Sequence, residues 1–151
     1  MNNIYDARDA QHYIERINKL SQESQGKWGK MSVAQMLAHL NVTYEQIFEP
    51  QKHKAPNGIA KFFLKNFVKA KIVNELPYKQ NLPTSPAFII STEKEFDEEK
   101  KKLVGNIQRV QQLGAEAFDG KENLSFGKLT AKEWNNMMVK HLEHHLAQFG
   151  V

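Results

Sequence analysis

A helix near the end of the chain is predicted by the segment TAKEWNNMMVKHLEHHLAQF, residues 130–149. Thr130 and Glu133 have the Ser/Thr-x-x-Glu/Gln spacing of a capping box, in which each side chain bonds the backbone N–H of the other residue. At about 100° per residue, His141 and His145 lie within about 20° of the direction of Trp134. The segment therefore predicts a helix over residues 131–148 whose apolar stripe contains two histidines.

The same start signal occurs twice more, from Ser32 to Gln35 and from Thr92 to Glu95, each time before apolar residues at helical spacing. We expect helices over residues 6–20, 33–48, 59–73, 93–113 and 131–148. Prolines 77, 83 and 86 break the chain between the third and fourth helices, so residues 74–91 are an irregular crossover in which 87–90 can be extended. No segment predicts a sheet, and the fold class is all-α.

The expected core is read from the apolar side of each helix. The expected inward residues are Tyr13, Ile14, Ile17 and Leu20; Val33, Met36, Leu37, Leu40, Tyr44 and Ile47; Phe62, Phe63, Phe67 and Ala70; and Phe96, Leu103, Val104, Ile107 and Val110.

Length and composition predict a single domain over residues 1–151. The chain has no cysteine, which excludes a disulfide-stapled miniprotein and any metal site built on thiolates. The N-terminal residues lack the basic and then apolar run of a signal peptide, and no apolar stretch approaches the roughly 18 residues of a spanning helix. We expect a cytoplasmic protein.

The positive charge of the chain is local. Residues 52–79 contain seven lysines and one glutamate, a net charge of +6, whereas the rest of the chain is slightly acidic and the total is +4. Such a cluster is most often a solvated face, although phosphates, anionic substrates and lipid head groups are also attracted to it. Arginine is scarce and no nucleic-acid-binding motif is present, so a nucleic-acid partner is not expected.

The histidines on the apolar side of the last helix predict a metal site. Two imidazoles at i, i+4 can bind one ion from the same side, and His39, at the border of the apolar stripe of the second predicted helix, can supply a third ligand. The alternative is that these histidines bond carbonyl groups or one another between helices. We expect His12 and His53 to lie outside the site.

A zinc-protease helix is disfavoured, because Leu142 stands where the His-Glu-x-x-His motif has its glutamate and Glu143 points away from the histidine face. No acid or base is unambiguously placed, so the catalytic residues are unknown. Side chains near the three histidines are candidates for orienting them: Gln35, Tyr44, His144 and Gln148. Gln35 and Thr43 lie on the side of the second predicted helix that carries His39. Whether His144 replaces or supports a ligand is open.

Two segments, KWGKMSVAQMLAHL (27–40) and KHLEHHLAQFGV (140–151), resemble the DinB/YfiT-like metalloenzymes, in particular a branch of unknown function in which FGKLT (126–130) precedes the last helix. The resemblance covers nearly the whole chain. It implies a four-helix bundle with a long crossover and an extra short helix, and one divalent ion, nickel or zinc, on His39, His141 and His145. The Arg-Gly that commonly follows the histidine pair is Leu146-Ala147 here.

The resemblance also implies an activity. Related proteins include transferases and isomerases that use low-molecular-weight thiols, and a thiol would have to come from a second molecule here. A hydrolase that uses water activated by the metal fits the same ligands. The alternative is a non-catalytic binding domain with a structural or absent metal, in which Phe62, Phe63 and Phe67 form a partner or membrane-surface face. Of partners, we expect a small-molecule substrate and neither nucleic acid nor membrane; a homodimer stays open.

Overall fold

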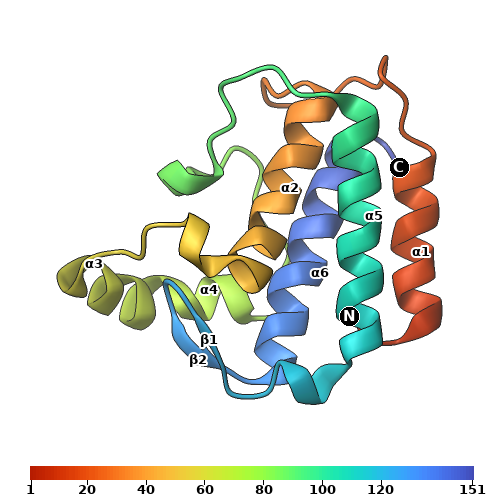
Figure 1. Cartoon of the computed structure of the whole chain (residues 1–151). Helices are drawn as coiled ribbons and strands as arrows, with labels where there is room; N and C mark the ends of the chain where they lie inside the picture. The colour runs from red at the N-terminus through yellow and green to blue at the C-terminus, as the bar shows by residue number, and fades with distance from the viewer.

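Four long helices lie side by side and form the body of the molecule (Figure 1). The computed structural model describes residues 1–151. Helix α2 packs against α5 and α6, and α1 closes the other side against the same two helices. The helices are α1 (Ala7–Asn18), α2 (Val33–Phe48), α5 (Phe96–Leu113) and α6 (Ala131–Gln148). The predicted all-α fold, a helical bundle, is confirmed.

One cluster of 26 buried apolar residues forms the core, and most of them lie on the inner faces of the four helices. The predicted inward residues of α1 and α2 are all buried, and among the largest fully buried side chains are Tyr13, Ile17, Met36 and Leu40. Helix α5 contributes Leu103, Ile107 and Val110 to the same cluster, while Val104 packs at its edge. No helix has the length and apolar composition needed to span a bilayer.

Two of the three predicted capping boxes are confirmed. Ser32 and Thr130 each accept the backbone N–H three residues later, and the third residue, Gln35 or Glu133, bonds back. The box predicted at Thr92 is wrong, because α5 begins at Phe96 and no side chain caps it. Three acidic residues in its first turn, 97–99, favour that end through the helix dipole instead.

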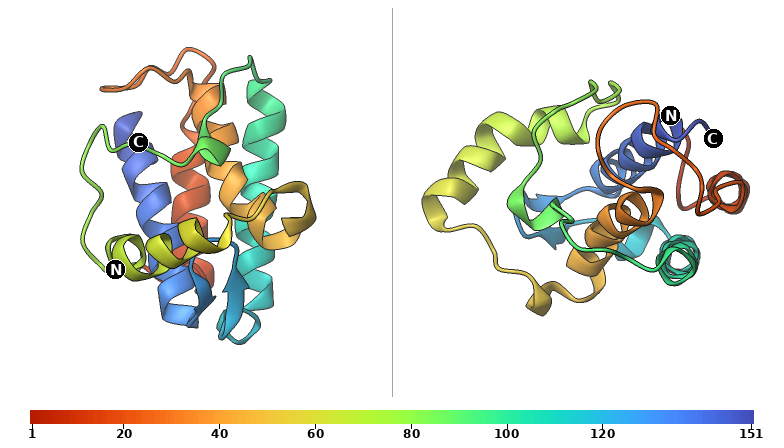
Figure 2. Two further views of the ribbon diagram at one scale, coloured as in Figure 1. Left: turned by 90° about the vertical axis from the view of Figure 1, so that its left-hand side faces the viewer. Right: turned by 90° about the horizontal axis from the view of Figure 1, so that it is seen from above.

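An arm leaves the bundle after α2. A short 3₁₀ turn (Pro50–Lys52) leads to α3 (Gly58–Phe63), a π-helical turn (Leu64–Val68) and α4 (Lys69–Val73). Together they form the helix predicted over 59–73, with a π-helical centre, and we call residues 58–73 the arm. Figure 2 shows it crossing the bundle at one side, with α3 standing away from the other helices.

The side of the arm that packs on the bundle was predicted wrongly. Leu64, Val68 and Ile72 lie against the core, whereas the expected inward residues Phe62, Phe63 and Phe67 are 68%, 56% and 62% exposed. Both sides of this segment carry apolar residues at helical spacing, so the period alone could not select the buried one. After the arm the crossover returns to α5 without a strand, and Pro86–Phe88 form a 3₁₀ turn rather than an extended segment.

A two-stranded hairpin precedes α6, so the expectation of no sheet is wrong. Strand β1 (Lys121–Asn123) pairs antiparallel with β2 (Gly127–Leu129). The Asn123 side chain accepts the backbone N–H of Ser125 and Phe126, at 2.9 and 3.0 Å, and Gly127 has a φ of +74° that suits glycine. Strands of three residues are too short to show an alternating pattern, which is why the sequence did not indicate them.

Candidate metal centre

Three histidines from two facing helices converge at the interface of α2 and α6. One ring nitrogen from each of His39, His141 and His145 lies within 4.8 Å of the others. The closest pair is Nε2 of His39 and Nε2 of His141, 2.8 Å apart. His39 and His145 are buried, and His141 is partly buried. The structure thus brings together the three residues that were predicted as ligands; metal binding itself stays a prediction.

The opposite nitrogen of each ring, Nδ1, has its own partner. His39 Nδ1 donates to the backbone carbonyl of Phe88 at 2.8 Å, and His145 Nδ1 lies 2.8 Å from Oε1 of Gln148. His141 Nδ1 lies 3.0 Å from the hydroxyl of Thr43. These contacts orient the rings so that their Nε2 atoms remain available, an arrangement typical of histidine ligands.

The partners also define which nitrogen carries the proton. A carbonyl oxygen only accepts, so the neutral His39 ring has its proton on Nδ1 and a bare Nε2. The same holds for His145, because Nε2 of Gln148 donates to the carbonyl of Trp28 at 2.7 Å and so turns Oε1 toward the ring. The unprotonated Nε2 atoms of His39 and His145 therefore converge, whichever ring nitrogen of His141 carries the proton.

His141 is the adjustable ring, because a threonine hydroxyl can either donate or accept. If Thr43 donates to Nδ1, then Nε2 of His141 carries the proton and donates to Nε2 of His39. If Thr43 accepts from Nδ1, all three Nε2 atoms are bare and only a cation can satisfy them together. The hydroxyl allows the cluster to fold without an ion and to present three ligand atoms to one.

Burial keeps the three imidazoles neutral. Desolvation is the largest cause that lowers the pKa of His39 and His141, the latter well below its ordinary value, and it lowers the pKa of His145 to about 3. The neighbouring histidines act in the same direction, because a proton on one ring disfavours a proton on the next. At neutral pH each ring is therefore uncharged, which is the form of imidazole that binds a metal ion.

Comparison with known families identifies the chain. The family described as "Protein of unknown function (DUF1569)" matches residues 3–150. The chain belongs to the DUF1569 family. No curated protein and no solved structure matches it.

The remaining histidines of this DUF1569 chain lie outside the cluster. His12 is exposed on α1 and its ring meets that of Tyr13 edge-on, and Nε2 of His53 lies 3.5 Å from a carboxylate oxygen of Glu45. His144 supplies no atom to the cluster, but its ring packs edge-on against His145 with 4.9 Å between centroids. Its place is beside the ligand set and not within it.

The orienting residues were predicted only in part. Gln148 contacts His145 as expected, whereas Gln35 serves the cap of α2 and donates to the carbonyl of Thr92. The contact of Thr43 with His141 was not predicted. Tyr44 is fully buried, and its hydroxyl has no hydrogen-bond partner. The sequence carried no signal for the carbonyls of Phe88 and Trp28, since any residue offers a carbonyl and its position depends on the path of a loop.

The DUF1569 cluster contains no carboxylate. Glu143 points away, as predicted, and accepts from the hydroxyl of Tyr13 and the guanidinium of Arg16 at 2.7 and 2.8 Å. The Phe88 ring covers the cluster from the crossover, 5.5 Å from the ring of His39 and 5.8 Å from that of His141, centroid to centroid. The site is therefore three neutral imidazoles under an aromatic ring, with no general base among them.

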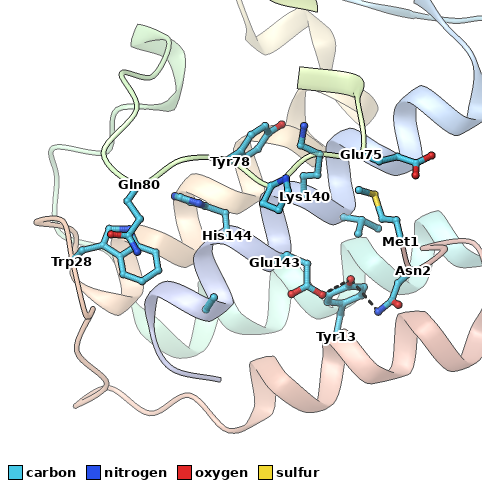
Figure 3. Close-up of a pocket in the computed structure, with 13 residues that line it drawn as sticks. Met1, Asn2, Tyr13, Trp28, Glu75, Tyr78, Gln80, Lys140, Glu143 and His144 are labelled. Carbon is cyan, nitrogen blue, oxygen red and sulfur yellow. Dashed lines mark hydrogen bonds between the residues drawn. The ribbon is translucent and has the colours of Figure 1, made fainter. Parts of the chain in front are cut away.

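A pocket of about 450 Å³ lies beside the cluster, bounded by α6, the crossover, and the N-terminal residues with α1 (Figure 3). His144 lines it, but none of the three clustered histidines does.

The buried Lys140 lies at the wall of this pocket and donates to the Lys71 carbonyl and the Asn74 side chain at 2.8 and 2.7 Å. Burial lowers the pKa of Lys140 to about 8. Its two donated bonds are directed at the end of α4, which makes Lys140 an anchor of the arm.

Proposed function

We propose that this DUF1569 chain binds one divalent metal ion through Nε2 of His39, His141 and His145 and is a metal-dependent enzyme. The supporting observation is the hydrogen bonding of the three Nδ1 atoms, which leaves the three Nε2 atoms directed at one another. Of the two arrangements that Thr43 allows, the one with three bare Nε2 atoms is the one that a cation satisfies. An all-imidazole donor set suits zinc or nickel.

The proposed chemistry is group transfer with a low-molecular-weight thiol. A divalent ion held by three protein ligands keeps open positions, and as a Lewis acid it lowers the pKa of a thiol or water molecule that it binds. The chain has no cysteine, so the thiol is a cosubstrate. The residues of the chain contribute orientation of the ligands through Thr43, Gln148 and the Phe88 carbonyl, and a covering aromatic ring that excludes water.

The resemblance to DinB/YfiT-like metalloenzymes supports this assignment, and we infer that DUF1569 is a branch of that group. The helical bundle, the long crossover and the placement of one histidine on α2 and two on α6 agree with it. A hydrolase that activates water on the same ion uses the same ligands.

A second candidate is a non-catalytic domain with a structural metal or none. One observation favours it: the adjacent pocket is not lined by the three histidines. The two candidates differ in whether the ion has an exchangeable position.

The decisive experiment measures metal content. We expect about one divalent ion per chain after reconstitution, and loss of the ion in His39→Ala, His141→Ala and His145→Ala. The matched controls His12→Ala and His53→Ala should keep it. Circular dichroism of each variant checks that loss of metal is not loss of fold. Retention of stoichiometric metal in the first three variants would refute the ligand assignment.

A second measurement separates the two candidates. Cobalt(II) in place of the native ion reports a bound thiolate by a charge-transfer absorption band. If the enzyme proposal holds, adding a low-molecular-weight thiol produces that band in the wild type and not in His141→Ala. A cobalt spectrum that is insensitive to thiol and to other small anions would instead indicate a closed, structural site.

A further inference from the structure

The arm presents a large apolar surface to solvent. Ile59, Phe62, Phe63 and Phe67 are 86%, 68%, 56% and 62% exposed, and we call these four side chains the aromatic face. Phe63 and Phe67 stack on each other with 5.0 Å between ring centroids. Single exposed apolar residues are ordinary on a protein surface, but three phenylalanines and an isoleucine on one short helical segment mark an interaction surface.

The arm cannot bury this face by folding back on the bundle, because its other side is already docked there. Leu64, Val68 and Ile72 pack against the core. The end of α4 is held by Lys140 and by Asn136, which donates to the Val73 carbonyl at 2.9 Å. The aromatic face is therefore fixed outward.

Ion pairs hold the arm along its length as well. Lys61 pairs with Glu122 of the hairpin at 3.1 Å, and Lys69 with Glu133 of α6 at 2.8 Å. These contacts attach both halves of the arm to the bundle. Figure 2 shows the arm crossing one side of the bundle, with its α3 end projecting away from the other helices.

Unpaired positive charge lies on the arm and in the chain beside it. The arm contains four lysines and no acidic residue. Lys65 and Lys71 are exposed and make no ion pair, and so are Lys54 and Lys79 in the flanking chain. A partner must therefore offer both an apolar phase for the rings and negative charge for the lysines.

This charge argues against a second copy of the chain as the partner. The four exposed lysines without an ion pair lie on the arm or beside it in the chain, so two arms brought face to face would place like charges near each other. An anionic bilayer meets both requirements, because its headgroups attract lysines and its acyl boundary accepts aromatic rings to a depth of about 5–10 Å.

We propose that the arm is a membrane-surface element that docks the chain on anionic lipid bilayers, with Phe62, Phe63 and Phe67 at the headgroup boundary and Lys65 and Lys71 on the headgroups. This reverses the expectation, drawn from the sequence, that no membrane is a partner. The docking is peripheral and does not require a spanning helix.

Vesicle flotation tests the proposal. We expect the full chain to float with phosphatidylcholine vesicles that contain phosphatidylserine, not with phosphatidylcholine alone, and to be released by salt. Phe62→Ser and Phe67→Ser should each weaken binding about tenfold or more, because each removes an inserted ring. Lys65→Gln and Lys71→Gln should each weaken vesicle binding about fivefold, which is the effect of one lysine at an anionic surface.

Matched controls lie on α5. Leu113 is 48% exposed and Lys101 is exposed without an ion pair, so Leu113→Ser and Lys101→Gln change an exposed apolar side chain and an exposed lysine outside the arm. They should bind like the wild type. Absence of flotation with anionic vesicles at low salt, or equal losses in arm and control variants, would overturn the proposal. So would a dimer, seen by analytical ultracentrifugation, that Phe62→Ser and Phe67→Ser abolish while vesicles have no effect, since the face would then belong to a second copy.

Discussion

The metal-free protein should lose stability as the pH falls from about 7 to about 5, and His145 allows the size of the loss to be worked out. Burial lowers the pKa of this ring to about 3 in the folded chain. In the unfolded chain the same ring takes up a proton near its ordinary pKa of about 6.5. At a pH between these two pKa values, His145 is protonated in the unfolded chain and neutral in the folded chain. The free energy of unfolding therefore falls as the pH falls.

The expected magnitude follows from that window. Each unit of pH below about 6.5 lowers the free energy of unfolding by about 1.4 kcal/mol per proton, so His145 alone contributes about 2 kcal/mol of loss at about pH 5. The side chain is only 6% exposed, so solvent does not screen the effect away. His39 and His141 act in the same direction, because their pKa values are also lowered by burial. The contribution is fully present above the unfolded pKa and is lost toward the folded one.

Urea unfolding in the presence of a chelator measures the effect. Between about pH 7 and about pH 5, the free energy of unfolding of the His145→Gln variant should fall by about 2 kcal/mol less than that of the wild type. The control, His12→Gln, changes an exposed side chain on α1 and should keep the wild-type dependence. Equal stability of the metal-free wild type at both pH values, or a His145→Gln variant with an unchanged slope, would refute the assignment of a buried, neutral imidazole.

Two other substitutions test the supporting contacts. Thr43→Val removes the hydroxyl that orients His141 and should weaken metal binding about 10–100-fold, whereas Thr43→Ser should bind like the wild type; a competitive metal titration that finds valine and serine alike would contradict this role. Lys140→Met leaves the Lys71 carbonyl and the Asn74 side chain without their donor and should cost about 1–3 kcal/mol in urea unfolding. An unchanged urea midpoint would show that Lys140 does not anchor the arm.

The bundle and the three histidines could be predicted because local patterns determine them. The capping residues Ser32 and Thr130 mark helix starts, and the angular positions of His141 and His145 place both on the buried stripe of α6. His39 faces them because α2 and α6 pack directly on each other. Each inference needed only the period of a helix and the rule that the apolar sides of neighbouring helices pack against each other.

The misses have a common physical cause, which is that they depend on tertiary contacts of short or two-sided segments. The arm has apolar residues on both sides, so burial of Leu64 and Val68 instead of Phe62 and Phe63 is decided by how the arm meets the bundle. The start of α5 was misplaced because Thr92 resembles a cap in sequence, while in the structure its carbonyl accepts from Gln35 instead.

The groups that orient the three histidines come from three separate parts of the chain, and this makes the site sensitive to the whole fold. Thr43 belongs to α2, the Phe88 carbonyl to the crossover, and the Trp28 carbonyl, acting through Gln148, to the loop before α2. If the partner of an Nδ1 atom moves, the hydrogen bond no longer determines which ring nitrogen carries the proton or where Nε2 points. The affinity of the site for an ion therefore depends on the conformations of two loops that supply no ligand. By linkage, an ion that binds only the folded arrangement stabilises those loops in return.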